Sequence, residues 1–127
     1  MSTDYQNDPW VICREGFDAA SLRESESVLA LGNGFIGMRG NLEELTAAGA
    51  PTVQGTYLNG VFESAPIVYG ENAFGYARNH ETICSVADAK SFILFADAER
   101  LDMGRSAVTG HVRSLDMREG ALRRSFR

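Results

Sequence analysis

Cysteine, proline and tryptophan are scarce in this chain, which has two, three and one of them in 127 residues. Cysteines as distant as Cys13 and Cys84 do not make a disulfide scaffold, and we expect both to be small buried apolar residues. No apolar run approaches the roughly 18 residues that cross a bilayer, so we expect no membrane role. No charged, apolar and small-residue leader opens the sequence, which favours a reducing cytoplasm.

Charge is unevenly distributed around the net value of −5. Residues 1–104 carry fifteen acids against six bases, whereas residues 105–127 carry six arginines against two acids. Clustered arginine is typical of phosphate binding, so a basic-tailed nucleic-acid binder is one alternative. The arginines, however, have no aromatic among them except Phe126 and do not line one strand face. We expect a solvated strand face that meets acidic surface elsewhere, and no nucleic-acid partner.

The domain organisation predicted is simple. Residues 1–9 are polar and lack periodicity, which predicts a disordered or frayed N-terminus. Residues 10–127 are enough for one domain with its own core. The strand-like run 121–127 has no polar tail, although domain ends usually lie in polar linkers. We therefore expect a truncated domain.

Short segments bounded by Gly, Asn, Asp or Pro predict an all-β fold, an antiparallel β-sandwich. Turns are expected at Asp88-Ala89, Asp97-Ala98 and Arg118-Glu119-Gly120, and only a brief helical turn is expected after Asp18. The predicted strands span residues 10–14, 28–31, 35–38, 56–62, 82–87, 92–96, 107–115 and 121–126.

A glycine-rich stretch at 32–37, GNGFIG, matches the dinucleotide-binding pattern G-x-G-x-x-G. That fingerprint also needs a helix at its third glycine and an acidic residue about 20 positions later. Gly40 interrupts the first turn of such a helix, and no acid follows at that spacing. The stretch therefore indicates a tight strand connection, in which Gly34 and Gly37 serve backbone geometry.

No catalytic or metal-binding residue is predicted. Glycoside cleavage needs opposed carboxyl groups, and the close acidic pairs here are interpreted as solvated loop residues. His80 and His111 are too far apart in sequence, and too far from cysteine, to indicate a metal pair. The acidic pairs are Glu15 with Asp18, Glu24 with Glu26, and Glu43 with Glu44.

Sugar contact is the one activity that the residues support directly. The long connection 64–80 is rich in aromatic and amide side chains, which stack on pyranose rings and bond to hydroxyl groups. Trp10 and Tyr57 lie inside predicted strands, so core packing is expected of them. The predicted substrate-contacting or interface residues are Tyr69, Glu71, Asn72, Phe74, Tyr76 and Asn79.

Several blocks in order along the chain resemble the N-terminal region of glycoside hydrolase family 65, the maltose, trehalose and kojibiose phosphorylases. One departure is Asp88-Ala89-Lys90, where that family often has Asp-Gly-Lys. The blocks are WVI at 10–12, EGFD at 15–18, ES at 26–27, LGNG at 31–34, GMRGN at 37–41, EE at 43–44, GTYLNGVFE at 55–63 and LDMREG at 115–120.

The resemblance implies the leading part of a galactose mutarotase-like supersandwich that precedes an (α/α) barrel. In that family the general acid and the phosphate site belong to the barrel, so this segment would be structural and inactive alone. The parent would cleave an α-linked glucose disaccharide by inverting phosphorolysis, as a homodimer, with inorganic phosphate as co-substrate and no cofactor. The alternative is a freestanding carbohydrate-binding β-module without catalysis.

Overall fold

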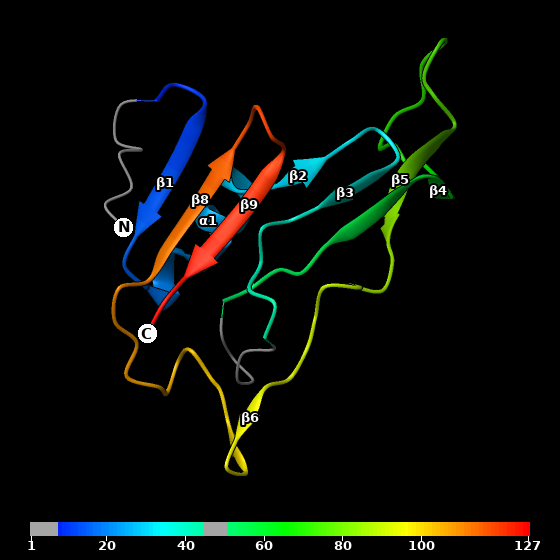
Figure 1. Cartoon of the computed structure of the whole chain (residues 1–127). Coiled ribbons are helices and arrows are strands. Elements are labelled where there is room, and N and C mark those ends of the chain that lie inside the picture. Colours follow the sequence, from blue (N-terminus) through cyan, green and yellow to red (C-terminus); the bar gives the residue numbers. More distant parts are fainter. Residues whose placement is uncertain (1–7, 45–50) are drawn as a thin grey trace.

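A computed structural model describes residues 8–44 and 51–127, and most of its regular structure is antiparallel strand (Figure 1). The predicted all-β fold class is confirmed. The predicted frayed terminus falls mainly on residues 1–7, which lie outside the described residues. The elements are β1 (Val11–Glu15), η1 (Ala19–Ser21), α1 (Leu22–Val28), β2 (Leu31–Gly32), β3 (Ile36–Met38), β4 (Thr56–Pro66), β5 (Asn79–Ser85), β6 (Phe95–Ala96), β7 (Glu99–Arg100), β8 (Val112–Asp116) and β9 (Ala121–Ser125).

One sheet, called sheet A, brings the two ends of the chain together in the antiparallel order β1-β8-β9. Val11 of β1 lies opposite Asp116 of β8. In the β8–β9 turn, Asp116 Oδ1 accepts the backbone N–H groups of Arg118 at 3.0 Å and Glu119 at 3.1 Å. Gly120 takes a left-handed φ of 62° there, so the predicted hairpin is confirmed.

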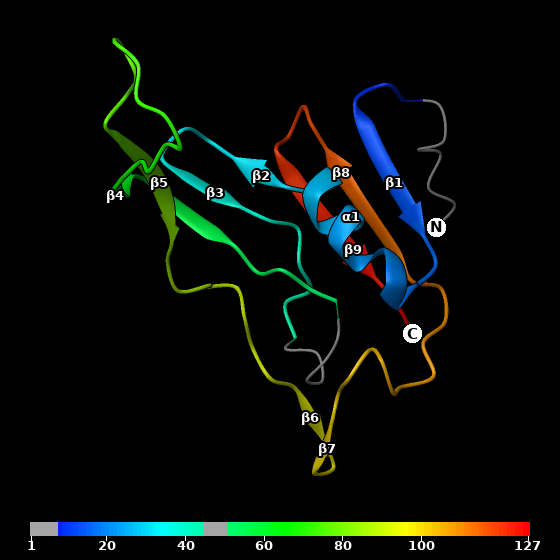
Figure 2. The same cartoon turned by 180° about the vertical axis from the view of Figure 1, so that it is seen from behind.

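Helix α1 covers one face of sheet A, as the rear view shows (Figure 2). Asp18 caps the preceding 3-10 turn by accepting the N–H of Ala20 at 3.0 Å. A buried hydrophobic cluster forms at the first residue of this helix, where Leu22 packs with Leu42 and Met103. No helix in residues 8–44 or 51–127 is long and apolar enough to span a membrane.

The strand predicted at 28–31 is largely wrong, because α1 continues to Val28 and β2 begins only at Leu31. Leu22, Glu26 and Leu29 are all buried and follow one another at helical spacing. Glu26 places a charged residue in the apolar stripe of this segment. For this reason hydrophobic spacing did not predict the helix. The partners of the Glu26 carboxylate come from outside the helix and are Arg39, Thr52 and Val53.

A second sheet, called sheet B, has the antiparallel order β2-β3-β4-β5. Its last two strands form a long hairpin that projects from the rest of the molecule (Figure 1). The pairing shifts register between Tyr57 and Phe62, where Gly60 has a φ of 88°. The strands extend further than predicted, so the connection between them, here called the hairpin loop, is residues 67–78.

The turn predicted at Asp97-Ala98 is confirmed and joins β6 to β7. Both residues have positive φ, 49° and 68°, as a type I′ hairpin turn requires. The hairpin turn predicted at Asp88-Ala89 is wrong. Asp88 lies in the connection between β5 and β6, where its side chain holds other parts of the chain together.

Trp10 was expected in the core as part of a predicted strand, and this prediction is wrong. It is 50% exposed at the end of the edge strand β1, with the Arg118 guanidinium 5.6 Å from its ring centroid. The ring is exposed because an edge strand has a neighbouring strand on one side only.

Tyr57 is partly buried. Cys13 and Cys84 are partly buried and unpaired, so they are less enclosed than predicted.

Candidate functional site

The sugar-contacting residues predicted from sequence lie in the hairpin loop. Its ends are joined where Ile67 N–H donates to the carbonyl of Arg78 at 2.8 Å. The rings of Tyr69 and Tyr76 meet with centroids 4.9 Å apart at 46°. The Tyr69 hydroxyl also donates to the carbonyl of Ala77 at 3.0 Å. These contacts fix an aromatic pair within an exposed loop.

A cavity of about 380 Å³ lies against this loop. Tyr69, Asn72 and Tyr76 of the six predicted residues line it. Glu71, Phe74 and Asn79 do not: Phe74 is fully exposed and Asn79 pairs with Pro66 in the β4–β5 ladder. The full lining is Ile67, Tyr69, Asn72, Ala73, Tyr76, Ala77 and Arg78.

The chemistry of this cavity suits binding and not bond cleavage. Aromatic faces contact the apolar face of a sugar ring, and an amide with a guanidinium bonds to hydroxyl groups. The lining contains no carboxyl group to protonate a leaving oxygen. The loop therefore offers contacts to a hydroxyl-bearing ligand or to a neighbouring protein surface.

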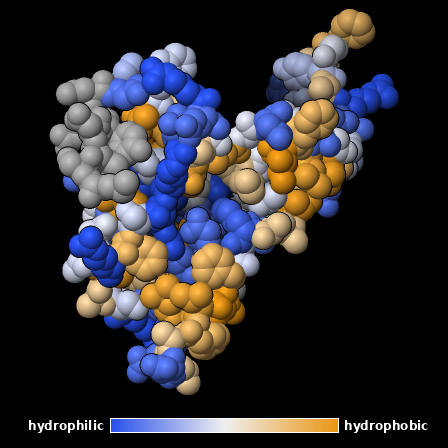
Figure 3. All heavy atoms as spheres, in the orientation of Figure 1, coloured by the Kyte–Doolittle hydropathy of each residue, from blue (hydrophilic) through white to orange (hydrophobic). Residues whose placement is uncertain are grey.

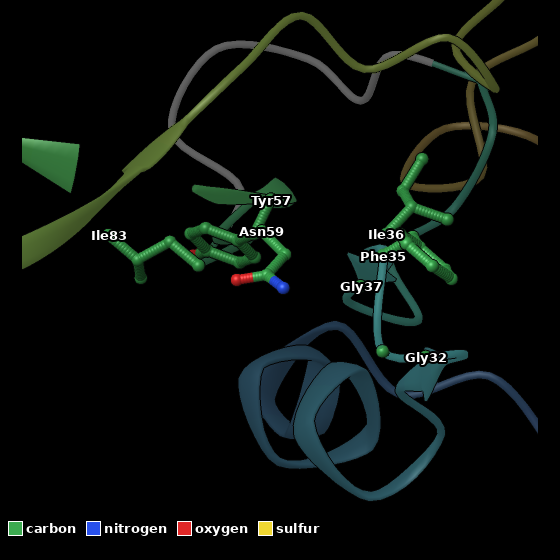
Figure 4. Close-up of a pocket in the computed structure, with 8 residues that line it drawn as sticks. Gly32, Phe35, Ile36, Gly37, Tyr57, Asn59 and Ile83 are labelled. Atoms are coloured by element: carbon green, nitrogen blue, oxygen red, sulfur yellow. The ribbon is translucent and has the colours of Figure 1, made fainter. Parts of the chain in front are cut away.

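A second hollow is a groove on sheet B, called the sheet groove, with a volume of about 310 Å³ (Figure 4). It falls where the sequence has its glycine-rich stretch. No helix follows the third glycine, in agreement with the exclusion of a dinucleotide site. The groove is lined by Gly32, Gly34, Phe35, Ile36, Gly37, Tyr57, Asn59 and Ile83.

The β2–β3 turn explains only part of the glycine requirement predicted for this stretch. Asn33 Oδ1 accepts the N–H groups of Phe35 and Ile36, each at 3.0 Å, and Gly34 has a φ of 88°. Gly34 therefore serves backbone geometry, as predicted. Gly37 does not, because its φ is ordinary and a Cβ there would come no closer than 3.9 Å to another residue.

The acidic pairs interpreted as solvated are in part deeply buried. Glu26 and Glu44 are each 1% exposed. Arg124 Nη2 donates to Glu44 Oε2 at 2.6 Å, and Arg124 Nη1 lies 3.1 Å from Glu43. The prediction is wrong for these residues because their counter-charges come from distant sequence. It holds for Glu24, whose exposed carboxylate pairs with Arg14.

The block GMRGN proves to be structural. Arg39 Nε donates to the carbonyl of Val53 at 2.8 Å, and Nη2 donates to Ser27 Oγ at 3.0 Å. Glu26 Oε2, 3.7 Å from this guanidinium, accepts the N–H of Val53 at 2.8 Å. Thr52 donates its hydroxyl to the same carboxylate. Arg39 and Glu26 thus hold helix α1 to the segment before β4.

Asn41, from the same block, holds the connection between β5 and β6. Its Nδ2 donates to Asp88 Oδ2 at 3.0 Å, and its Oδ1 accepts from Lys90 Nζ at 2.8 Å. Lys90 also donates to Asp88 at 2.6 Å. Burial acts to raise the pKa of Asp88, but the hydrogen bonds from Lys90 and Asn41 outweigh it and lower the pKa to about 2. Asp88 is therefore ionised at neutral pH, as a structural partner of Lys90.

The two histidines lie in different surroundings. Residues 8–44 and 51–127 contain no group of three or more His, Cys, Asp or Glu placed to hold a metal ion. His80 is exposed, and His111 is buried with Nδ1 3.0 Å from the carbonyl of Gly16. Burial lowers the pKa of His111, and the nearby Arg124 and Arg113 act in the same direction. His111 is therefore a neutral interior side chain.

The basic C-terminal region meets acidic groups of the same chain. Arg113 is buried, donates to the carbonyl of Gly40 and has a pKa lowered by burial. The other arginines mostly form ion pairs, so they meet acidic surface as expected. The expected solvation is wrong for Arg113, which is 4% exposed, and for Arg124, whose side chain is 11% exposed. The pairs are Arg105 with Asp102, Arg118 with Asp8, Arg123 with Asp116 and Glu119, and Arg124 with Glu43 and Glu44.

Comparison with known proteins identifies relatives of this chain. Residues 12–127 match the family model described as glycosyl hydrolase family 65, N-terminal domain. The chain is 36% identical over 124 residues to the α,α-trehalose phosphorylase of Thermoanaerobacter brockii. It is 40% identical over 117 residues to an uncharacterized glycosyl hydrolase of Mycobacterium leprae, and 31% identical over 121 residues to the maltose phosphorylase of Bacillus subtilis.

These matches cover nearly all of this chain but only a small part of the length of each relative. They cover 97%, 92% and 95% of the chain and 16%, 14% and 16% of the trehalose phosphorylase, the M. leprae protein and the maltose phosphorylase. A solved structure from the human microbiome, described as a kojibiose phosphorylase, superposes with a TM-score of 0.80 at 25% identity. That superposition covers 95% of this chain and 16% of the solved one.

Proposed function

This chain belongs to the N-terminal domain family of glycosyl hydrolase family 65, and on that basis we propose that it is the non-catalytic leading part of a longer carbohydrate-active enzyme. The observation that carries the proposal is the match of residues 12–127 to that family. Two of the similar proteins are phosphorylases of trehalose and of maltose, of which this chain spans 16%. The longer enzyme would cleave an α-linked glucose disaccharide with inorganic phosphate.

The chain's own carboxylates support a structural role. An inverting reaction needs a proton donor to the leaving glycosidic oxygen, while phosphate attacks the anomeric carbon from the opposite face. Glu26 and Glu44 are buried and engaged with Thr52, Val53 and Arg124. Carboxylates held in this way support a structural role for these two residues. Proton donor and phosphate site would both belong to an (α/α) barrel that follows this domain.

The test is a phosphorolysis assay on two proteins, the 127-residue chain and the longer polypeptide. With maltose, trehalose, kojibiose or nigerose and inorganic phosphate, the longer protein is expected to release β-glucose 1-phosphate from at least one disaccharide. The 127-residue chain is expected to give only background, because it lacks the positioned acid. Free glucose as the sole product would make the parent a hydrolase. Turnover by the short chain would refute its structural role.

We further propose that the hairpin loop reaches the entrance of the parent's substrate pocket. Replacing Tyr76 with alanine removes one ring of the fixed aromatic pair, so the KM for disaccharide should rise about 5- to 150-fold, the equivalent of about 1–3 kcal/mol of stacking and burial. The kcat should change little, because the loop holds no reacting group. Steady-state kinetics of the parent measure both constants, and Phe74→Ala, outside the cavity lining, is the matched control.

The same loop supports the second candidate, a freestanding carbohydrate-binding module, because its cavity has aromatic, amide and guanidinium groups without any catalytic partner. Glycan binding by the isolated chain, lost in Tyr76→Ala, would favour that function. An unchanged KM in the parent would leave the loop as an interface element.

We propose that the parent is a cytoplasmic homodimer that needs no cofactor. The unpaired state of Cys13 and Cys84 agrees with a reducing compartment.

A further inference from the structure

The cavity against the hairpin loop carries a single charged side chain, the guanidinium of Arg78. The other side chains of its lining are apolar, aromatic or amide, and no carboxylate is among them. Within residues 8–44 and 51–127, the Arg78 side chain forms no hydrogen bond or ion pair. The cavity therefore presents a positive charge that no described group of the chain pairs with, and such a charge attracts an anion.

Most other arginines of the chain hold the fold together. Arg113 donates to the carbonyl of Gly40, and Arg124 pairs with Glu44. Arg78 has no such structural contact through its side chain, so its charge is available to a ligand and its removal should leave the fold unchanged. The arginines engaged within the chain are Arg14, Arg39, Arg105, Arg113, Arg118, Arg123 and Arg124.

The loop fixes the backbone of Arg78 beside the aromatic pair. The Ile67 N–H donates to the Arg78 carbonyl at 2.8 Å, and the Tyr69 hydroxyl donates to the carbonyl of Ala77 at 3.0 Å. The same Tyr69 ring lies 4.9 Å from that of Tyr76. Figure 3 shows the projecting β4–β5 hairpin clear of the rest of the molecule, with hydrophilic and hydrophobic surface mixed at its free end. Rings held in place before a ligand arrives reduce the ordering cost of binding.

We propose that this cavity binds a phosphorylated monosaccharide, with the sugar ring against Tyr69 and Tyr76 and the phosphate on Arg78. A guanidinium binds phosphate oxygens through two parallel N–H donors, and the Asn72 amide offers a donor and an acceptor to hydroxyl groups. A neutral disaccharide would leave the cation without a partner. The volume of about 380 Å³ is at the small end of ligand pockets, which suits one sugar ring.

The identity of the sugar rests on the proposed function. Phosphorolysis of a glucose disaccharide releases a glucose that carries the phosphate, so the parent would itself produce a ligand of this class. The hairpin loop would then bind the product of the reaction outside the catalytic barrel. The phosphate group is shared with inorganic phosphate, and the sugar ring is shared with glucose, so the test compares all three compounds.

The test is a titration of the 127-residue chain with β-glucose 1-phosphate, glucose and inorganic phosphate, followed by the NMR shifts of the backbone amides of residues 67–78. We expect glucose 1-phosphate to bind about tenfold or more tightly than either of the others, because it alone uses both the rings and the guanidinium. Arg78→Ala should weaken glucose 1-phosphate by about tenfold or more and leave glucose unchanged. Added salt should weaken glucose 1-phosphate but not glucose.

Three further variants separate the cation from the rings. Arg23→Ala is the matched control, since Arg23 is exposed on α1 and its side chain likewise has no partner among the described residues. It should leave all three affinities unchanged. Arg78→Lys keeps the charge but not the planar fork, so it should recover part of the loss. Tyr76→Ala should weaken glucose and glucose 1-phosphate by the same factor, because it removes a ring and leaves the cation in place.

Each other result overturns the inference in its own way. Equal affinities for glucose and glucose 1-phosphate would assign the cavity to neutral sugars, and equal affinities for phosphate and glucose 1-phosphate would make it a simple anion site. Amides of residues 67–78 that do not shift with glucose 1-phosphate would show that the cavity binds no sugar phosphate. An active parent with no such binding in this chain refutes this inference alone. Binding by the chain, with a parent that performs no phosphorolysis, refutes only the proposed function.

Discussion

Replacing Arg124 with leucine is expected to lower the free energy of unfolding by about 3–5 kcal/mol, because it strips a buried carboxylate of its counter-charge. Glu44 is 1% exposed and accepts from Arg124 at 2.6 Å through Oε2. Its Oε1 has no hydrogen-bond partner among the described residues. Without the guanidinium, Glu44 must take up a proton or leave the interior. Urea unfolding followed by circular dichroism measures the loss.

Arg14→Leu is the control for this prediction. Arg14 and Glu24 also form an ion pair, but their side chains are 43% and 63% exposed. Exposed pairs contribute at most about 1 kcal/mol, so this variant should unfold almost as the unmodified chain does. Adding Glu44→Gln to Arg124→Leu should recover part of the loss, since no buried charge is left. Equal stabilities for Arg124→Leu and Arg14→Leu would show that the buried pair does not hold β9 in place.

Gly40→Ala is expected to destabilise the chain by about 1–3 kcal/mol, the usual range for overpacking of an interior position. A Cβ at this position would lie 2.6 Å from the carbonyl oxygen and 2.8 Å from the Cβ of Leu29. Leu29 is itself fully buried just after α1, so it has no space to move away. Gly40 also donates its N–H to the carbonyl of Glu26 at 2.8 Å. Thermal or urea unfolding checks the effect.

Gly37→Ala is the matched control from the same motif, three residues earlier. Its new methyl group meets nothing closer than 3.9 Å, so the free energy of unfolding should change by less than about 0.5 kcal/mol. A large loss in both variants would indicate that backbone freedom, and not close packing, makes these glycines necessary. A loss in Gly40→Ala alone supports the contact between helix α1 and the GMRGN block.

The turns of this fold could be predicted because their chemistry is local. Asp97-Ala98 and Gly120 each join strands next to each other in sequence, and a positive φ or a side-chain cap is enough to specify them. The same reasoning failed at Asp88-Ala89. Nothing nearby in sequence shows that the Asp88 carboxylate is held by Asn41, 47 residues earlier.

The candidate site was predicted in part for the same reason. Tyr69, Asn72 and Tyr76 lie within one loop, so proximity in sequence placed them together. The sheet groove was not predicted, because Phe35, Tyr57 and Ile83 meet only after β3, β4 and β5 pair. The only sequence signal for it was the glycine-rich stretch, which indicates a missing side chain but not what surrounds it.

By itself, the sequence determined the fold class, the family resemblance and the local turns, since hydrophobic spacing and glycine positions act over a few residues. Only the tertiary structure decided which charged side chains are buried and which groups they pair with. Glu26 and Glu44 read as solvated acids, yet each is buried because groups as distant as Val53 and Arg124 reach it. Burying a carboxylate is costly unless partners are supplied at the same point in space. Those partners come from sequence 27 and 80 residues away, so folding alone brings them together.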